Sequence, residues 1–369
     1  MWRGVRKFLA IIIIVCTSIL IGIFLIQKQE VHHSFATEKF IKRWLMNENG
    51  TLATYIKESN QLDEDLVQGR EALSETLGLW MQYALEEENE QLFQDAFEIL
   101  TTYFLEKDGF IHWKLNQSGV SEVDTNALVD DLRIISGLLS AYRKWENEQY
   151  MEVARIISNY ISRFNVTNNI LTDFYDRKHQ YSSDVITLSY IDPEPLEQMF
   201  QREYLDKETY RNTMDVLVSA PLEHGFYPKS YHETKQTYLF EGEINMVDQA
   251  LVAYHLAKLN IVSNDFVRFV EEEIAHRGVV NGKYEKSTKK PVVTYESPAV
   301  YGILILFSIE SNNYSLAEKL YERMKVFRND NKKHNYYGGY SVSLTGDTHI
   351  FDNLVPLFAE KKLMNSWNN

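Results

Sequence analysis

Apolar side chains recur at helical spacing along most of the chain. Between Glu71 and Leu85, and again between Leu92 and Leu105, they fall every third or fourth residue and so line one face of a helix. The residues on these two faces are Leu73, Leu77, Trp80, Met81 and Ala84, then Phe93, Phe97, Leu100 and Phe104. The two segments are therefore predicted to pair as a helical hairpin.

Further pairs of such segments follow along the chain. They are Ala127–Trp145 with Tyr150–Phe164, Met246–Leu259 with Asp265–His276, and Ser297–Ser308 with Ser315–Val326. The pairs do not repeat in sequence, which excludes a consensus solenoid. The pattern predicts an all-α domain in which varied helical hairpins form a barrel.

Long stretches rich in Tyr, Asp, Gly and His separate the predicted helices. They are Asp108–Asn126, Thr172–Pro195, Gly225–Glu243 and Asn331–Asp347. Loops of this length in a compact domain are usually functional, so a site is expected at one end of the barrel. Within the last loop, the stretch Gly338–Leu344 is expected to form a small hairpin.

The first 30 residues have a different pattern. Phe8–Ile26 carries no charge and is long enough to cross a bilayer as a helix, and Arg3, Arg6 and Lys7 precede it. The positive-inside rule then predicts a membrane anchor in residues 1–30 and an extracellular domain in residues 31–369. A cleaved signal peptide is one alternative, and a lipoprotein attached at Cys16 is another, although Val15 suits lipid attachment poorly.

Composition and charge narrow the chemistry. The net charge of −14 disfavours nucleic acid as a partner, and the single Cys forbids an internal disulfide or a Cys-cluster metal site. No metal-binding, phosphate-binding or serine-hydrolase motif is present, so no cofactor is expected. The 23 Tyr, 19 Phe and 6 Trp residues suit stacking on sugar rings, although most such residues serve as helix core.

Carboxylates beside apolar helix faces are the remaining candidates for chemistry. Glu75 precedes Leu79 and Trp80, where lost hydration would raise its pKa, although a first-turn Glu also stabilises the helix dipole. Asp130 and Asp131 stand at the head of an apolar helix that Asp131 could cap. Asp248 lies in an apolar helical run, or faces solvent in its first turn.

Taken in order, several short motifs resemble those of glycoside hydrolase family 8, a family of (α/α)6 barrels that includes endoglucanases, chitosanases and xylanases. The matching segments are Ser74-Glu75-x-x-Gly78-x-x-Met81, Asp108-Gly109-Phe110-x-x-Trp113, Asp131-Leu132-Arg133-Ile134 followed by Ala141 and Trp145, Leu188-Ser189-Tyr190-Ile191-Asp192-Pro193, Gly225-Phe226-Tyr227-Pro228, and the surroundings of Asp248. The match runs from about residue 70 to residue 360.

The resemblance implies inverting hydrolysis of a β-linked polysaccharide. Glu75 would donate a proton to the glycosidic oxygen, and Asp248 would accept one from the attacking water. Asp131 would bind the sugar at the cleavage subsite, with Asp130 beside it. The aromatic residues expected to line the groove are Trp113, Tyr190 and Tyr231. Should Asp248 prove structural, the base is to be sought among Asp130, Asp192 and Glu243.

The chain also departs from the family pattern. Val129 replaces the first Asp of the family signature, Trp80 a Gly, Val247 a Tyr, and Leu251 an Arg. These losses leave open a membrane-tethered polysaccharide-binding or assembly protein without turnover, and a purely structural scaffold would leave the aromatic loops unexplained. An anchored, outward-facing enzyme would act on polysaccharide made at the same membrane, which implies the exopolysaccharide synthesis or export machinery as a partner.

Overall fold

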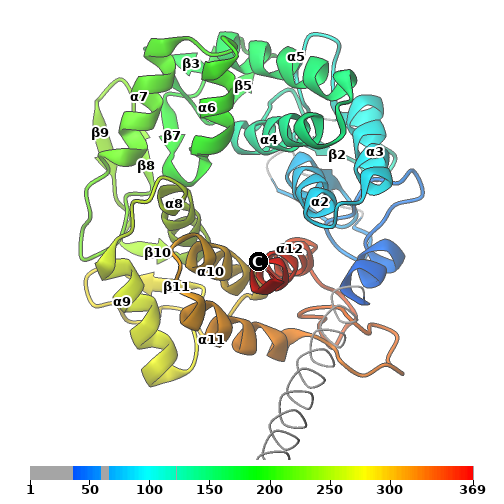
Figure 1. The fold of residues 1–369 in the computed structure, drawn as a ribbon, viewed down its shortest axis with the longest axis vertical. Helices are drawn as coiled ribbons and strands as arrows, with labels where there is room; N and C mark the ends of the chain where they lie inside the picture. Colours follow the sequence, from blue (N-terminus) through cyan, green and yellow to red (C-terminus); the bar gives the residue numbers. More distant parts are fainter. Residues whose placement is uncertain (1–35, 60–65, 122, 369) are drawn as a thin grey trace, which may run out of the picture.

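The computed structural model describes residues 36–59, 66–121 and 123–368. Within these ranges, helices form an inner ring that closes on itself, since each contacts the next and the last contacts the first (Figure 1). The inner helices are α2 (Ser74–Glu86), α4 (Leu128–Trp145), α6 (Pro193–Gln201), α8 (Met246–Lys258), α10 (Pro298–Glu310) and α12 (Phe351–Asn368).

An outer layer of helices surrounds the ring (Figure 1). It contains a helix over residues 36–44 together with α3 (Glu90–Ile99), α5 (Glu148–Phe164), α7 (Lys207–Val218), α9 (Asn264–Glu272) and α11 (Tyr314–Met324). Inner and outer helices alternate along the chain, so the arrangement is the predicted all-α barrel of hairpins.

Polar caps fix where several inner helices begin. The side chain of Asn245 accepts a hydrogen bond from the backbone N–H of Val247 at the start of α8. Ser297 caps α10 and Asp192 caps α6, and each is followed by a Pro that cannot donate a backbone hydrogen bond and is preset for the first helical turn.

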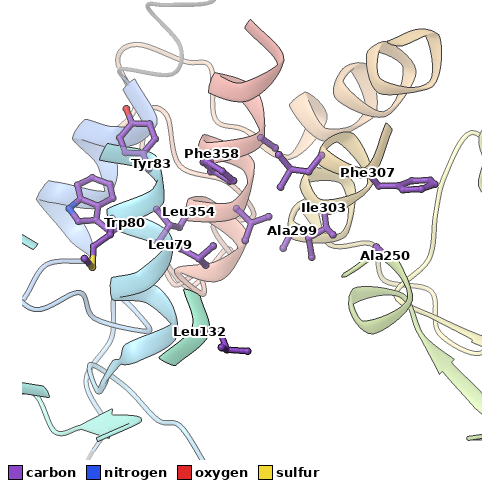
Figure 2. Packing of buried hydrophobic residues seen from close by; sticks show 14 of the residues in the cluster. Leu79, Trp80, Tyr83, Leu132, Ala250, Ala299, Ile303, Phe307, Leu354 and Phe358 are labelled. Atoms are coloured by element: carbon purple, nitrogen blue, oxygen red, sulfur yellow. The ribbon is translucent and has the colours of Figure 1, made fainter. Parts of the chain in front are cut away.

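The core lies between the inner helices. Figure 2 shows side chains from α2, α10 and α12 filling the space between these helices, among them Leu79, Ile303 and Phe358. Residues 298–308 of α10 are all buried, because this helix is covered on every side. Gly302 allows α10 to approach α12, since a Cβ at this position would lie 2.9 Å from Cγ1 of Val355.

Short antiparallel strands lie in the connections and fix the starts of inner helices. β1 (Ala72–Leu73), which pairs with β2 (Lys114–Leu115), runs directly into α2. β10 (Glu243–Asn245) pairs with β11 (Lys283–Glu285) and runs into α8. The remaining strands are β3 (Val166–Thr167) with β4 (Ile170–Leu171), β5 (Tyr175–Asp176) with β6 (Tyr181–Ser182), and the sheet of β7 (Val185–Thr187), β8 (Ser230–His232) and β9 (Thr237–Leu239).

The structure confirms the four predicted hairpins as α2–α3, α4–α5, α8–α9 and α10–α11. The helices α6, α7 and α12 and the helix over residues 36–44 were not predicted from the sequence pattern. The hairpin expected at Gly338–Leu344 is wrong, because these residues form turns with one bridge from Tyr340 to Arg328. Gly338 instead lets the loop contact the outer helix, since a Cβ there would lie 2.5 Å from the backbone of Ala36.

The expected membrane anchor, Phe8–Ile26, lies outside the described residues. Among residues 36–59, 66–121 and 123–368, no helix combines the length and apolar character needed to cross a bilayer.

Candidate active site

Carboxylates from the first turns of three inner helices gather around one phenol ring. Glu75 comes from α2, Asp130 from α4 and Asp248 from α8. Burial, together with the negative charges of these three groups and of Asp173, raises the pKa of Tyr190. The four carboxylates therefore lie within electrostatic reach of one phenol, and the motifs of the sequence had singled out three of them, Glu75, Asp130 and Asp248.

Glu75 has the proton affinity of a general acid. Burial raises the pKa of its carboxyl to about 7, the charge of Asp130 adds to this increase, and the Arg133 guanidinium opposes it. An acid with a pKa near the working pH can both hold a proton and give it up, so Glu75 can donate a proton to a bound substrate.

Asp130 is fixed beside Glu75 by neighbours on two helices. Its Oδ2 accepts a hydrogen bond from the Ser74 hydroxyl at 2.7 Å, and its Oδ1 accepts one from Nη1 of Arg133 at 3.1 Å. Burial raises the pKa of Asp130, while Arg133, Ser74 and the backbone N–H of Glu75 act to lower it. Asp130 is therefore the carboxyl group whose negative charge raises the pKa of Glu75 further.

Asp248 remains accessible at the site, with 16% of its side chain exposed. Its Oδ1 accepts a hydrogen bond from the Ser189 hydroxyl at 3.0 Å, and its Oδ2 pairs with Nζ of Lys229 at 2.5 Å. The carboxylate is thus held in a defined orientation while part of it is open to water.

Two residues of this site were missed by the sequence analysis. Asp173 accepts hydrogen bonds from the backbone N–H of Thr187 at 2.6 Å and from its hydroxyl at 2.7 Å. Burial raises the pKa of Asp173 to about 6, with opposing effects from Lys229 and Asp248. Both Asp173 and Lys229 lie in the long loops that were expected to be functional, but neither belongs to a motif that separates it from other polar loop residues.

The structure does not bring Asp131 together with Glu75. Successive helix residues point about 100° apart, so α4 directs Asp130 toward α2 and Asp131 elsewhere. Oδ2 of Asp131 accepts a hydrogen bond from Asn126 at 2.6 Å, and Asn126 bonds in turn to Asn165. Asp131 is 1% exposed, and burial raises its pKa well above the usual value. In this structure Asp131 therefore belongs to an internal hydrogen-bond network with Asn126 and Asn165.

The predicted aromatic residues are distributed differently around the site. The Trp113 carbonyl accepts a hydrogen bond from the Ser74 N–H at 3.0 Å, so half-buried Trp113 lies beside the start of α2. Tyr190 lies among the carboxylates, as described above. Tyr231 lies on β8 and packs against Tyr238, whose hydroxyl donates to the Val216 carbonyl of α7.

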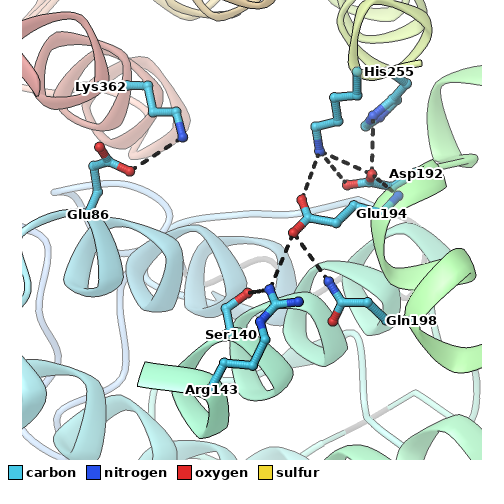
Figure 3. A network of polar contacts seen from close by, with 9 residues as sticks. Glu86, Ser140, Arg143, Asp192, Glu194, Gln198, His255 and Lys362 are labelled. Atoms are coloured by element: carbon cyan, nitrogen blue, oxygen red, sulfur yellow. Dashed lines mark hydrogen bonds and ion pairs between the residues drawn. The ribbon is translucent and has the colours of Figure 1, made fainter. Parts of the chain in front are cut away.

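Neither Asp192 nor Glu243 joins the carboxylate group. Asp192 caps α6 and accepts two hydrogen bonds from Nζ of Lys258, at 3.1 and 3.2 Å, in the network of Figure 3. Lys258 ends α8, about 15 Å along the helix from Asp248. Burial alone would raise the pKa of Asp192, yet Lys258 and His255 hold it below its usual value. Glu243 is exposed on β10.

Two of the departures from the family pattern share one place. Val129 and Leu251 both line a small cavity of about 50 Å³ inside the barrel, together with Arg133, His255 and Lys258. The two apolar replacements therefore line the same internal cavity. Neither of them takes the place of a carboxylate in the group around Tyr190. Within the described ranges, no cluster of three or more His, Cys, Asp or Glu side chains is arranged to hold a metal ion.

Comparisons with known proteins agree with this architecture. Residues 17–228 match the family described as glycosyl hydrolases family 8. A Bacillus subtilis (strain 168) protein named "Putative lipoprotein YdaJ" is 37% identical over 329 residues, which cover 89% of this chain and 86% of that protein.

Solved structures share the fold at lower sequence identity. A structure titled as a novel alpha-amylase from Clostridium perfringens superposes with a TM-score of 0.81 at 24% identity, covering 89% of this chain and 97% of that one. The endo-beta-1,4-glucanase CMCax from Acetobacter xylinum superposes with a TM-score of 0.61 at 13% identity, covering 90% and 98%.

Proposed function

The chain belongs to glycosyl hydrolases family 8 and is a glycosidase, and from this premise we propose that it cleaves a β-linked polysaccharide by inversion of the anomeric centre. The observation that carries the proposal is the group of carboxylates that act on Tyr190, in which half-buried Glu75, whose pKa is raised, and partly exposed Asp248 come from different helices. Inverting hydrolysis needs two such groups, one on each side of the sugar.

In the proposed mechanism, Glu75 donates its proton to the glycosidic oxygen as the bond from that oxygen to the anomeric carbon breaks. Asp248 accepts a proton from a water molecule on the opposite face of the sugar, and the water oxygen bonds to the anomeric carbon. Carboxyl groups of inverting enzymes stand about 6.5–9.5 Å apart to admit this water. The ion pair with Lys229 and the hydrogen bond from Ser189 orient the Asp248 carboxylate for its role.

The remaining site residues support the two reacting groups. We assign the position next to the acid to Asp130, which contacts Ser74 and Arg133, and a structural role to the buried Asp131. Trp113, beside the start of α2, would stack on a sugar ring, and the Tyr190 hydroxyl would donate a hydrogen bond to the sugar. Tyr231 belongs to the wall of the neighbouring sheet rather than to this group.

An α-linked glucan is a second candidate substrate. The observation that favours it is the superposition, at a TM-score of 0.81, on a structure whose title names an alpha-amylase. The carboxylates described above serve either linkage, because protonation of the leaving oxygen and activation of water are needed in both.

A screen of polysaccharides tests the proposed function. Purified protein is incubated with β-glucans, chitosan, xylan, starch and the host's own exopolysaccharide, and new reducing ends are measured together with the anomer that forms first. Cleavage of a β-linked polymer with inversion is expected. Cleavage of starch alone would replace the β-linkage by the α-linkage, and binding without cleavage of any polymer would contradict turnover.

We further propose that the domain faces outward at the cell membrane and trims or releases exopolysaccharide near its export machinery. Support comes from the apolar stretch Phe8–Ile26 and from a relative that is named a putative lipoprotein. The name of this relative favours lipid attachment at Cys16 as an alternative anchor.

Protease treatment of intact cells tests this location. Residues 31 onward should be digested while the N-terminus is retained with the cells. A domain that resists protease until the membrane is broken would place it inside the cell. Mass measurement of the retained fragment distinguishes a lipid on Cys16 from an unmodified helix.

A further inference from the structure

Arg133 is held tightly between the two helices that carry Glu75 and Asp130. It lies on α4, and its aliphatic stem packs over Gly78 of α2, one turn beyond Glu75. A Cβ at Gly78 would lie 3.1 Å from Cδ and 3.2 Å from Cγ of Arg133. Only glycine leaves room for this contact without displacement, so the path of the Arg133 side chain is defined by the approach of α2 and α4.

The guanidinium at the end of this stem reaches Asp130. Nη1 of Arg133 lies 3.1 Å from Oδ1 of Asp130; the Asp130 side chain is buried, with 6% exposed, and that of Arg133 is largely covered, with 11% exposed. The other oxygen of Asp130 accepts the hydrogen bond from Ser74, which directly precedes Glu75. A continuous set of contacts therefore runs from Arg133 through Asp130 to the start of α2.

Charged and titratable groups from several elements surround Arg133, Asp130 and Glu75. Glu75 is influenced by Asp130 and Arg133 of α4, and Tyr190, which lies between α4 and α8 on the chain, is influenced by Glu75. On its other side, Arg133 lines the barrel cavity with Asp192, His255 and Lys258.

The titratable groups on the other side of the cavity do not neutralise the charge of Arg133. Asp192 and Lys258 form an ion pair with each other. Burial lowers the pKa of His255 to about 4, so its ring is uncharged near neutral pH. Among these described neighbours, Asp130 is the anion that Arg133 contacts directly.

Building on the proposed function, we propose that Arg133 is a positioning residue for the acid: through Asp130 it places a positive charge beneath Glu75 and so lets Glu75 release its proton to the glycosidic oxygen. When that proton leaves, two carboxylates stand side by side in a buried place, which is costly unless a cation is near. Without Arg133, Glu75 holds its proton more strongly and is a weaker acid, and its donation slows according to the Brønsted relation.

Arg133→Gln tests this role, because it removes the charge and keeps a hydrogen-bond donor. The infrared band of the protonated Glu75 carboxyl, assigned by its loss in Glu75→Gln, is followed against pH in the intact protein without substrate. In wild type its midpoint is expected near pH 7. In Arg133→Gln the midpoint should rise by about one pH unit or more, as for loss of a nearby opposite charge.

Arg143→Gln is the matched control. Arg143 lies on the same helix, is half-exposed, and pairs with Glu194 at 3.7 Å. Arg143 lies ten residues after Arg133 on α4. The same change of charge there should leave the pH midpoint of Glu75 at its wild-type value. Arg133→Lys keeps the charge but loses the planar fork, so its midpoint should lie between those of wild type and Arg133→Gln.

Activity gives an independent readout with whichever polymer the screen identifies. The basic limb of the pH–rate profile in Arg133→Gln should move upward with the infrared midpoint, and an aryl glycoside with a good leaving group should regain most of the lost rate, because it needs little proton donation. A lower rate at every pH with an unmoved profile and midpoint would show a purely structural role and overturn the proposal.

Asp130→Asn provides a second variant if Arg133→Gln does not fold. Removal of the negative neighbour should lower the Glu75 midpoint, opposite to the effect of Arg133→Gln. An unchanged or raised midpoint would overturn the coupling through Asp130. If Glu75→Gln retains full activity, the proposed function itself fails; if Glu75→Gln is inactive but the midpoint ignores Arg133, only the present inference fails.

Discussion

Replacement of Glu75 by Gln is expected to lower the rate of polysaccharide cleavage by about 10²–10⁴-fold, the usual effect of losing an acid–base group. The amide keeps the shape of the carboxyl but has no proton to donate at neutral pH. Reducing-end release and the melting temperature are measured on the same preparation. Sugar affinity should change little, so the loss should appear in kcat.

The stability of this variant should depend on pH in a defined direction. The pKa of Glu75 is about 7 in the folded protein and near the ordinary value in the unfolded chain, so ionisation is disfavoured by folding. Wild-type stability therefore falls as pH rises from about 4.5 through 7, whereas Glu75→Gln lacks this loss. The variant should be the more stable protein at pH 8.

Glu86→Gln is the control for the same helix. Glu86 ends α2 and pairs with Lys362 at 3.5 Å, far from the carboxylate group. It should retain the wild-type rate. Retention of more than about a tenth of the rate in Glu75→Gln would show that Glu75 is not the acid.

Asp248→Asn is expected to abolish turnover while leaving substrate affinity nearly unchanged. The amide keeps one acceptor for the hydrogen bond from Ser189 but cannot take the proton of the attacking water. Azide should partly restore cleavage of an activated glycoside, because an anionic nucleophile needs no base. Rates are compared per folded molecule, with affinity measured by calorimetry on the polymer found in the screen.

Asp192→Asn separates a catalytic from a structural aspartate. Asp192 contacts the opposite end of α8 and pairs with buried Lys258, so its loss should cost about 3–5 kcal/mol of stability with little change in rate per folded molecule. If Asp248→Asn behaves in this way instead, Asp248 is structural and the base is another group, of which Asp173 is the nearest candidate in the site.

Local pattern was sufficient to predict much of the barrel and the desolvation of Glu75. The apolar face after Glu75 indicated a desolvated carboxyl, and in the structure desolvation raises the pKa of Glu75. The partner that adds to its raised pKa is Asp130, which comes from α4 and is fixed by a hydrogen bond to Ser74. Contacts between helices so distant in sequence are set by how the barrel packs, which periodicity alone does not reveal.

The limits of the sequence pattern are clearest for Asp131 and the short helices. A one-residue step around α4 decides whether Asp130 or Asp131 faces Glu75, and the motif spacing favoured Asp131. The helix α6, which was not predicted, is only nine residues long and carries two Pro residues in its first turn, so few positions are left to show an amphipathic stripe. Asp173 and Lys229 come from loops, whose backbone path depends on tertiary contacts.

The closure of the inner ring by α12 has a consequence for how the protein comes to fold. Phe351, Val355 and Phe358 complete the wall of the barrel cavity, and α12 packs against both α10 and α2. Until these residues have been synthesised, α2 and α10 each keep an apolar face uncovered, although the chain that carries the carboxylates is already complete. A chain with these uncovered apolar faces is prone to aggregation, and the contact between its first and last inner helices forms late in folding. A product shortened before Phe351 should therefore need chaperone protection and lack activity, even though none of the proposed catalytic residues is missing.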